Sequence, residues 1–349
     1  MKAVILQESG KIEIKDVKEP QILKGDILLK TKYAAICHTD IKILTGKKKV
    51  KYLSFPRILG HEFIGEVVEK GESHTRFNMG DLIIPYPGIF CGKCEYCLSG
   101  NHNLCQNMEA LGYNLDGGFA EYVRLPQSIF DNNRSRVFKI SSEFSPRTAC
   151  LLEPVSCCFN AMKQSNVKEG DTVLIIGLGF MGLIMVQMAR IFGATRVIGS
   201  DPIEFRRSKA RELGADSVLD PTEENYKEKI KDLTYGQGAE VVIVALDNPR
   251  ISEEALQFVK AGGSLNLFGG TPHGSQICID PNIIHYKQVN LVGTSGYRLQ
   301  DTNKVLKIIE KNVINVESLI TGIYPLDRFK EALENVINYK DIKAVISFN

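Results

Sequence analysis

The chain has 349 residues, of which 44% are hydrophobic and 24% are charged. This length exceeds what one hydrophobic core usually supports, so we expect two folded domains and not a disordered or fibrous chain. The 43 basic residues nearly balance the 41 acidic residues, which argues against nucleic acid or a membrane surface as a partner.

The first 150 residues predict short strands separated by Gly, Pro and Asp, a pattern typical of an all-β barrel. The strands are expected at 2–8, 11–17, 26–36, 63–71, 81–87 and 119–126. The apolar run at the start, "AVIL", is too short for a signal peptide. We therefore expect a cytoplasmic protein whose cysteines serve metal binding or thiol chemistry and form no disulfide framework.

Four of the nine cysteines lie together at Cys91, Cys94, Cys97 and Cys105. Their C-x2-C-x2-C-x7-C spacing lets four thiolates close on one metal ion. A ferredoxin run has a shorter last gap followed by proline, so the pattern favours zinc over iron and over four free thiols. Four thiolates leave no open coordination position, which makes this a structural zinc site.

Residues 171–201 predict a buried strand, a glycine-rich turn, a helix and a second strand that ends in an acid. Gly177, Gly179 and Gly182 form the G-x-G-x-x-G pattern of a dinucleotide-binding loop. Phe180 and Met181 complete this loop, and the helix that follows offers its N-terminus to the phosphates. Further strands near 239–246 and 262–270 predict a doubly wound parallel sheet.

Asp201 ends the second strand, 19 residues after Gly182. An acid at this place accepts hydrogen bonds from ribose hydroxyls and repels a 2′-phosphate, so we expect NAD and not NADP. Arg206 either contacts the cofactor or lies on a solvated helix face.

Candidate ligands for a second metal are scattered through the first half: Cys37 in "ICHTDIKI", His61 and Glu62 in "LGHEF", and Glu153 in "LLEPVS". Each alone has an ordinary reading, as a core cysteine, a turn histidine or an ion-pair partner. Together they offer the soft, borderline and hard donors that zinc binds.

With these motifs the chain resembles the zinc-dependent medium-chain dehydrogenases over essentially its whole length. The shared motifs are C-x-T-D at 37–40, G-H-E at 60–62, the cysteine lobe, "DGGFAEYV" at 116–123, E-P-V-S at 153–156 and the glycine loop. The glutamate followed by proline at 153–154 makes the chain most similar to the sorbitol and threonine dehydrogenase branches. The resemblance implies an α/β fold: a GroES-like β-barrel catalytic domain (1–156 and 294–349) and an NAD-binding Rossmann domain (157–293). It also implies a homodimer or homotetramer.

The resemblance further implies site residues. Cys37, His61 and Glu153 would bind a catalytic zinc, with Glu62 beside it as an occasional ligand, and a fourth position would remain open for the substrate hydroxyl. Thr39 would contact the substrate oxygen and begin a proton relay. His38 would continue that relay, touch the cofactor phosphates or face solvent.

Two features bear on the substrate. The loop 45–57 carries four lysines and an arginine, and is either a solvated charge run or a basic rim for an acidic polyol. Tyr297 and Arg298 lie near the place where the sorbitol branch contacts substrate hydroxyls. We expect NAD-dependent oxidation of a secondary alcohol of a polyol, sugar acid or sugar phosphate. The alternatives are L-threonine 3-dehydrogenase and a non-catalytic relative that binds zinc and nucleotide.

Overall fold

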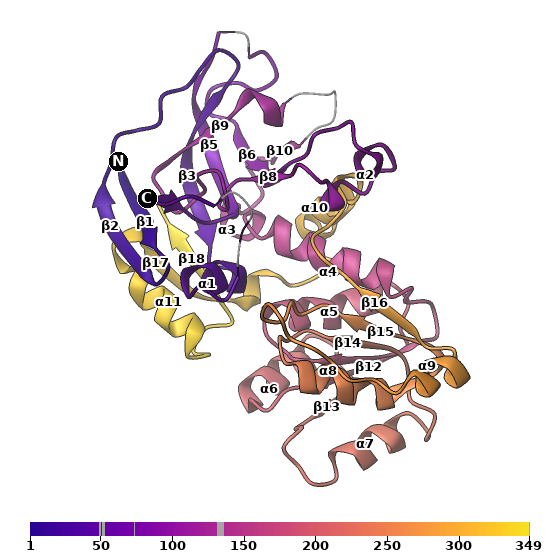
Figure 1. Cartoon of the computed structure of the whole chain (residues 1–349). Helices are drawn as coiled ribbons and strands as arrows, with labels where there is room; N and C mark the ends of the chain where they lie inside the picture. Colours follow the sequence, from indigo (N-terminus) through magenta and orange to yellow (C-terminus); the bar gives the residue numbers. More distant parts are fainter. Residues whose placement is uncertain (49, 51–52, 73, 131–135, 349) are drawn as a thin grey trace. The chain divides into compact units, whose positions relative to one another are not determined.

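The computed structural model describes residues 1–48, 50, 53–72, 74–130 and 136–348 (Figure 1). These residues form two compact units, 1–154 with 298–349, and 155–297. The domain junctions expected from the sequence, 156/157 and 293/294, stay a prediction. Helix α4 (Leu152–Gln164) begins at the end of the first unit and continues into the second.

The first unit is built mainly from antiparallel strands. Its large sheet has the order β10-β6-β5-β3-β18-β17, with β9 also paired to β3, and a second sheet has the order β2-β1-β4. The strands are β1 (Lys2–Glu8), β2 (Lys11–Asp16), β3 (Ile27–Ala35), β4 (Arg57–Ile58), β5 (Glu62–Lys70), β6 (Leu82–Pro85), β7 (Gly88–Ile89), β8 (Glu109–Ala110), β9 (Tyr122–Leu125), β10 (Val137–Lys139), β17 (Ile320–Pro325) and β18 (Lys343–Ser347). The strands predicted from the sequence are all present.

Short helices connect these strands. They are α1 (His38–Leu44), α2 (Glu95–Leu98), α3 (Pro146–Ala149), α10 (Thr302–Glu310) and α11 (Phe329–Ile337), with 3-10 turns η1 (His102–Leu104), η2 (Gln127–Ile129), η4 (Leu299–Asp301), η5 (Glu317–Leu319) and η6 (Leu326–Arg328). The C-terminal segment returns to the first unit, where β18 pairs antiparallel with β3 and parallel with β17. Strands from the N-terminal and C-terminal parts of the chain therefore share one sheet.

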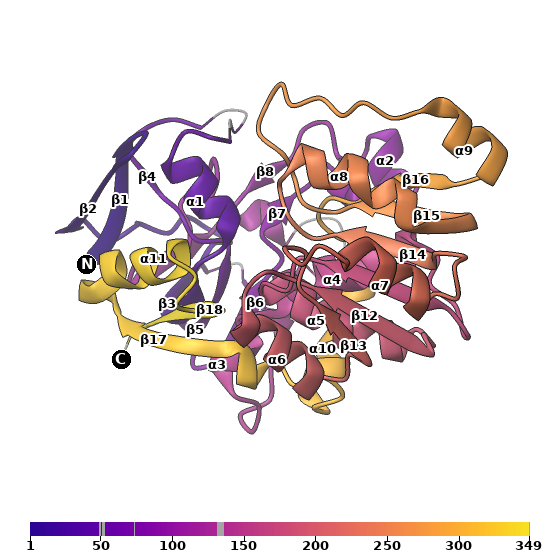
Figure 2. The same ribbon diagram turned by 90° about the horizontal axis from the view of Figure 1, so that it is seen from below.

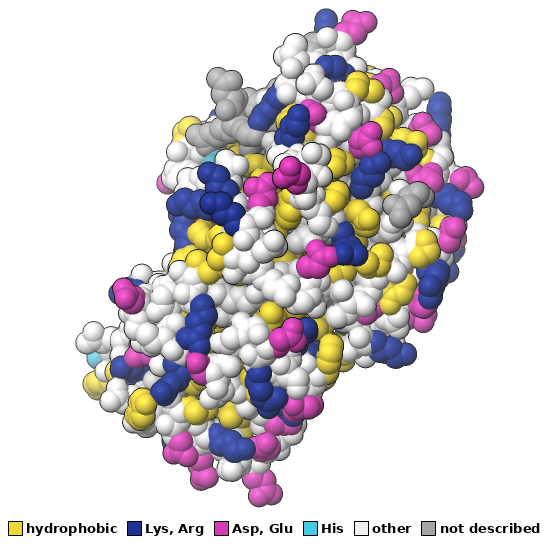
Figure 3. All heavy atoms as spheres, turned by 180° about the vertical axis from the view of Figure 1, so that it is seen from behind, with side chains coloured by type: hydrophobic (Ala, Val, Ile, Leu, Met, Phe, Trp, Pro, Cys, Tyr) yellow, Lys and Arg dark blue, Asp and Glu magenta, His cyan; other side chains and the backbone are white. Residues whose placement is uncertain are grey.

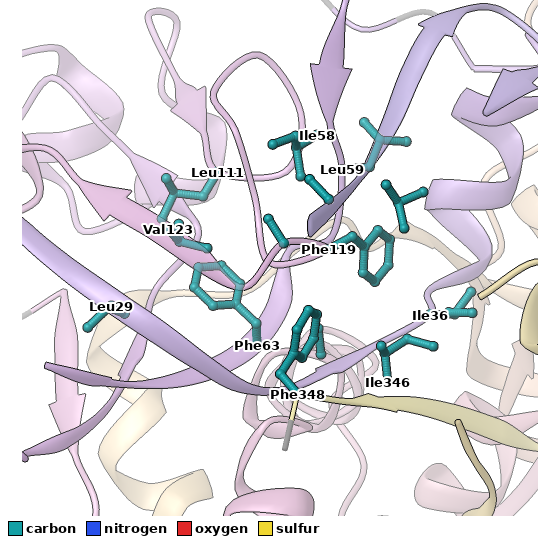
Figure 4. Packing of buried hydrophobic residues seen from close by; sticks show 14 of the residues in the cluster. Leu29, Ile36, Ile58, Leu59, Phe63, Leu111, Phe119, Val123, Ile346 and Phe348 are labelled. Atoms are coloured by element: carbon teal, nitrogen blue, oxygen red, sulfur yellow. The ribbon is translucent and has the colours of Figure 1, made fainter. Parts of the chain in front are cut away.

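The core of the first unit lies between the sheets. Figure 4 shows Phe63 of β5, Phe119, Ile346 of β18 and Phe348 packed together, and Phe119 also meets Phe329 of α11 ring to ring at 4.8 Å. All of these side chains are buried, so the hydrophobic effect holds the early and late segments of the chain together.

The second unit is a six-stranded parallel sheet with the order β13-β12-β11-β14-β15-β16. The strands are β11 (Thr172–Ile176), β12 (Arg196–Ser200), β13 (Ser217–Leu219), β14 (Ala239–Val244), β15 (Val259–Leu267) and β16 (Asn290–Gly293). The helices are α5 (Phe180–Ile191), α6 (Glu204–Glu212), α7 (Tyr226–Leu233), α8 (Pro249–Ala255) and α9 (Pro281–Lys287), with η3 (Leu256–Phe258). Figure 2 shows the sheet and its helices from a second direction.

This strand order is the Rossmann order, with the reversal between β11 and β14. Because crossovers between parallel strands are right-handed, a chain that winds outward in both directions covers both faces with helices. One face packs against α7, α8 and η3 through a buried cluster that includes Leu174, Val242, Ile230, Ala255 and Leu256. The doubly wound α/β prediction is confirmed.

Charge is mixed on the surface. Figure 3 shows Lys and Arg side chains interspersed with Asp and Glu over the face drawn there. Among the described residues, no helix has the length and apolar character needed to cross a membrane.

Candidate active site and metal centres

Cys37 is the N-cap residue of α1. The Thr39 backbone N–H donates to Cys37 Sγ (3.4 Å), and the Cys37 N–H donates to the Asp40 carboxylate (3.0 Å). This reciprocal cap satisfies amide groups that a helix start leaves unpaired, and it holds the thiol in place. Thr39 is half-buried beside the thiol, and His38, the first helical residue, is exposed.

His61 is buried between an acid and an aromatic ring. Its Nδ1 lies 3.2 Å from Asp40 Oδ1, and its ring centroid lies 4.8 Å from that of Tyr113. Because Asp40 engages Nδ1, the other ring nitrogen is left for a metal. Burial acts to lower the pKa of His61, but the negative charges of Asp40 and Cys37 outweigh it and raise that pKa well above its ordinary value. The surroundings therefore favour a cation.

Three glycines hold the turn that precedes His61. Gly60 has a φ of +93°, and a Cβ on Gly117 would lie only 2.2 Å from the Gly60 carbonyl oxygen. A Cβ on Gly112 would lie 2.5 Å from the same atom. Only glycine allows such close backbone contact, so these residues fix the position from which His61 and Glu62 enter the site.

Glu62 is fully buried and paired with a lysine from the other end of the chain. Lys343 Nζ lies 2.6 Å from Glu62 Oε2 and donates to the Ile36 carbonyl (3.1 Å). Burial acts to lower the pKa of Lys343, but Glu62 and Cys37 raise it above its ordinary value. The ammonium is therefore charged, and it neutralises Glu62 at the edge of the site.

Cys37, His61 and Glu62 form a donor group whose ligand atoms all lie within 4.8 Å of one another. A thiol, an imidazole and a carboxylate in negative surroundings fit zinc. Glu153 lies in the first turn of α4 and is half-buried. In the part of the chain that the structure describes, it is not a member of this close group, so its role as a ligand stays a prediction.

The four cysteines of the lobe also lie within 4.8 Å of one another. Cys91 Sγ lies 3.9 Å and Cys94 Sγ 3.5 Å from Cys97 Sγ, too far for a disulfide and close enough for shared metal coordination. Backbone N–H groups of Lys93 and Cys94 stabilise the thiolate and lower the pKa of Cys91 to about 6. The cluster fits a structural zinc.

The glycine-rich loop of the second unit joins β11 to α5. Gly177 has a φ of +96°, and a Cβ on Gly182 would lie 1.9 Å from the Gly177 carbonyl oxygen. A Cβ on Gly179, the N-cap of α5, would meet nothing within 4 Å. The loop therefore has the close helix–strand packing and the open backbone that a pyrophosphate needs. Phe180 and Met181 form the first turn of α5, with Phe180 buried and Met181 half-buried.

Asp201 is buried beside this loop. Its carboxylate accepts hydrogen bonds from the N–H groups of Leu178 (2.8 Å) and Ile203 (2.9 Å). Arg206 Nη1 lies 3.6 Å from the same carboxylate. Asp201 thus ties the glycine loop to the end of β12, and Arg206 is an ion-pair partner of Asp201.

Comparison with known proteins agrees with these features. Residues 23–131 match the model of the alcohol dehydrogenase GroES-like domain, and residues 181–311 match that of the zinc-binding dehydrogenases. An L-threonine 3-dehydrogenase of Caldanaerobacter subterraneus is 31% identical over 99% of this chain and 98% of its own. The chain belongs to the zinc-dependent medium-chain dehydrogenase family.

Other members are about as similar. The sorbitol dehydrogenase of Bacillus subtilis is 30% identical over 98% of this chain and 95% of its own. A zinc-binding dehydrogenase of Sinorhizobium meliloti, solved with NADP bound, is 30% identical with a TM-score of 0.90, covering 99% of this chain and 98% of that one. This chain is therefore a zinc-dependent oxidoreductase of the alcohol dehydrogenase type, and the comparisons do not separate polyol from threonine as substrate.

The predicted substrate residues of this dehydrogenase lie in the sequence where the second unit ends and the chain returns to the first. Tyr297 is buried and ends the second unit, and Arg298 is half-buried and begins the returning segment of the first. Their substrate contacts stay a prediction. The basic loop 45–57 is described only in part, because residues 49 and 51–52 lie outside the described residues.

Sequence reasoning missed the groups that hold the donor set. Asp40 belongs to a recognised motif, but its contact with His61 requires α1 to lie against the start of β5. Tyr113 and Lys343 carry no sequence signal, because they reach the site only through loop and strand packing far along the chain.

Proposed function

We propose that this protein is an NAD-dependent zinc dehydrogenase that oxidises a secondary alcohol of a polyol, a sugar acid or a sugar phosphate. The observation that carries the proposal is the close grouping of Cys37, His61 and Glu62 in the first unit. The glycine loop with Asp201 in the second unit supports the cofactor.

Zinc, when bound by these donors, would polarise an alcohol oxygen, and NAD would accept the hydride. We propose Cys37, His61 and Glu153 as the zinc ligands. Asp40 keeps the His61 ring oriented and its Nδ1 engaged. Lys343 neutralises Glu62, so that Glu62 adds little negative charge to the donor set.

The chain must also remove the proton of the alcohol. Thr39 lies two residues from Cys37 and its backbone is fixed by the thiol, so its hydroxyl is a suitable first acceptor in a relay. His38 is exposed beside it and would pass the proton onward or contact the cofactor phosphates.

The choice of NAD rests on Asp201. A buried carboxylate at the end of β12 favours ribose hydroxyls over a 2′-phosphate. A relative from Sinorhizobium was solved with NADP bound. In this chain, Arg206 pairs with Asp201 and would have to turn toward a 2′-phosphate to bind it.

L-Threonine is the second candidate substrate. The chain is 31% identical to the Caldanaerobacter threonine dehydrogenase and 30% identical to the Bacillus sorbitol dehydrogenase, so sequence similarity supports L-threonine as well as a polyol.

The deciding experiment measures NADH formation by zinc-replete protein with neutral polyols, sugar acids, polyol phosphates and L-threonine, each repeated with NADP. Turnover of polyols or their acids with NAD supports the proposal. Turnover of L-threonine alone would assign the second candidate.

Metal analysis separates an enzyme from a non-catalytic relative. We expect two zinc ions per chain, one for each donor group. Cys37→Ala should remove one zinc and all turnover, and Cys94→Ala should release the other. A single zinc that survives Cys37→Ala but not Cys94→Ala would contradict the enzyme proposal.

A further inference from the structure

Lys48 is held close to the donor group by the backbone that follows α1. The helix begins directly after Cys37 and ends at Leu44. Gly46, with a φ of +72°, then reverses the chain, and the Lys48 N–H donates to the Lys42 carbonyl (3.0 Å). Lys48 is therefore anchored to the same short helix that presents the Cys37 thiol.

The side chain of Lys48 extends over an aromatic ring of the site. Its Nζ lies 5.4 Å from the centroid of Tyr113, whose ring lies 4.8 Å from that of His61. The Lys48 ammonium and the His61 ring therefore both contact the same tyrosine ring. A cation over the face of a tyrosine is stabilised by the ring quadrupole, so Tyr113 is a platform for this charge.

The negatively charged groups that act on Lys48 belong to the candidate active site. Burial lowers the pKa of Lys48, and the negative charges of Cys37, Asp40 and Glu153 act in the opposite direction. Among the described residues, no carboxylate lies within ion-pair distance of its ammonium. The Lys48 residue as a whole is exposed although its ammonium is partly desolvated, so a ligand can reach it.

We propose that Lys48 is a specificity-determining residue that binds an anionic group of the substrate, a carboxylate or a phosphate, beside the hydroxyl that is oxidised. The inference rests on the proposed function and narrows its substrate class to hydroxy acids of the sugar-acid type and to sugar phosphates. The ammonium supplies hydrogen-bond donors to the anion, and Tyr113, which also contacts His61, holds the ammonium in place.

The neighbouring Lys47 provides a matched control. It has the same charge and is also exposed, but it follows Gly46 directly, and the ring contact with Tyr113 belongs to Lys48. A general basic rim would use both lysines equally. A specific contact would use only Lys48.

The test compares Lys48→Gln, Lys48→Arg and Lys47→Gln on paired substrates. Each pair is an alditol and the aldonate of the same configuration, such as D-glucitol and D-gluconate, with the alditol phosphate as a third arm. We expect Lys48→Gln to lower kcat/KM for the anionic member on the order of 10- to 100-fold, mainly through KM, since it removes a charged hydrogen bond. The neutral member should change less than about threefold.

The remaining variants sharpen the result. Lys48→Arg should keep most of the preference, and Lys47→Gln should behave as wild type. The arm that responds, aldonate or alditol phosphate, identifies the anion. Equal effects on neutral and anionic members, a rise in the KM for NAD alone, or the same loss with Lys47→Gln would overturn the inference.

A binding measurement keeps this inference separate from the proposed function. Calorimetric titration of the aldonate into the wild-type and Lys48→Gln complexes with NADH requires no turnover. Weaker binding to the variant supports the role of Lys48 even if no alcohol is oxidised, which would contradict the proposed function alone. Equal binding would overturn the role of Lys48 even in an active dehydrogenase.

Discussion

Glu62 and Lys343 form a buried ion pair at the residue scale, with side chains 0% and 6% exposed. Two charges removed from water are tolerated only while each compensates the other, and the loss of one partner leaves an unpaired buried charge. The second Glu62 oxygen has no hydrogen-bond donor among the described residues, so the pair depends on one short contact.

Lys343→Met is therefore expected to lower the free energy of unfolding by about 3–5 kcal/mol, measured by urea denaturation of the zinc-loaded protein. Adding Glu62→Gln should restore a large part of this loss, because the unpaired charge is removed. Lys2→Met, which breaks the exposed pair with Asp327, is the control and should cost less than about 1 kcal/mol. A small loss for Lys343→Met would contradict the assignment of a mutually dependent pair.

Asp40 supports the donor group through two contacts, with His61 Nδ1 and with the Cys37 N–H. Asp40→Asn keeps the shape of the side chain but removes the charge that orients the histidine. We expect zinc affinity or kcat/KM to fall about 10- to 100-fold. Competition with a chelator and steady-state kinetics measure the two effects, and unchanged values for both would show that the contact is only structural.

At the scale of an element, the glycine loop meets two requirements with different residues: close packing of a helix on a strand, and open space for a ligand. Gly182 permits the close approach of α5 to the end of β11, and Gly179 leaves its space open. One position serves packing within the chain, and the other serves the approach of a ligand.

Alanine at these two positions should give different defects. Gly182→Ala forces its Cβ against the Gly177 carbonyl and should cost about 1–3 kcal/mol of stability by overpacking. Gly179→Ala should cost less than about 1 kcal/mol but raise the Kd for NADH on the order of tenfold. Urea unfolding and NADH fluorescence titration measure the two. Wild-type NADH affinity in Gly179→Ala would show that the cofactor does not approach this backbone.

Short-range sequence patterns predict some elements of the site and not others. The cysteine lobe and the glycine loop are recognisable because their parts lie within about one loop of each other and each spacing has a physical purpose. The contact of His61 with Tyr113 depends on the packing of a distant loop, and that of Glu62 with Lys343 depends on strand pairing between distant segments. A lysine in "IKAVISF" reads as an ordinary strand residue until β18 is placed beside β3.

At the scale of the whole molecule, the metal donors and the nucleotide loop belong to different compact units. The donors Cys37, His61 and Glu62 lie in the first unit and the glycine loop in the second. Each set is held by contacts within its own unit, so loss of one bound group need not unfold the site for the other.

Removal of the catalytic zinc by a chelator should therefore abolish turnover but leave NADH binding nearly intact. We expect the Kd for NADH to change by less than about threefold, because Asp201 and the loop keep their own contacts. Fluorescence titration before and after dialysis measures this, and added zinc should restore turnover. If NADH binding were lost together with zinc, the two sets would not be independent.

The position of Lys343 in the last strand has a consequence for protein synthesis. The donors Cys37, His61 and Glu62 are synthesised early, but Lys343, the cation that neutralises Glu62, is synthesised 281 residues after Glu62. A truncated product that lacks β18 therefore retains a buried carboxylate without its partner. The buried charge of Glu62 is therefore neutralised only after β18 has been synthesised and has paired with β3.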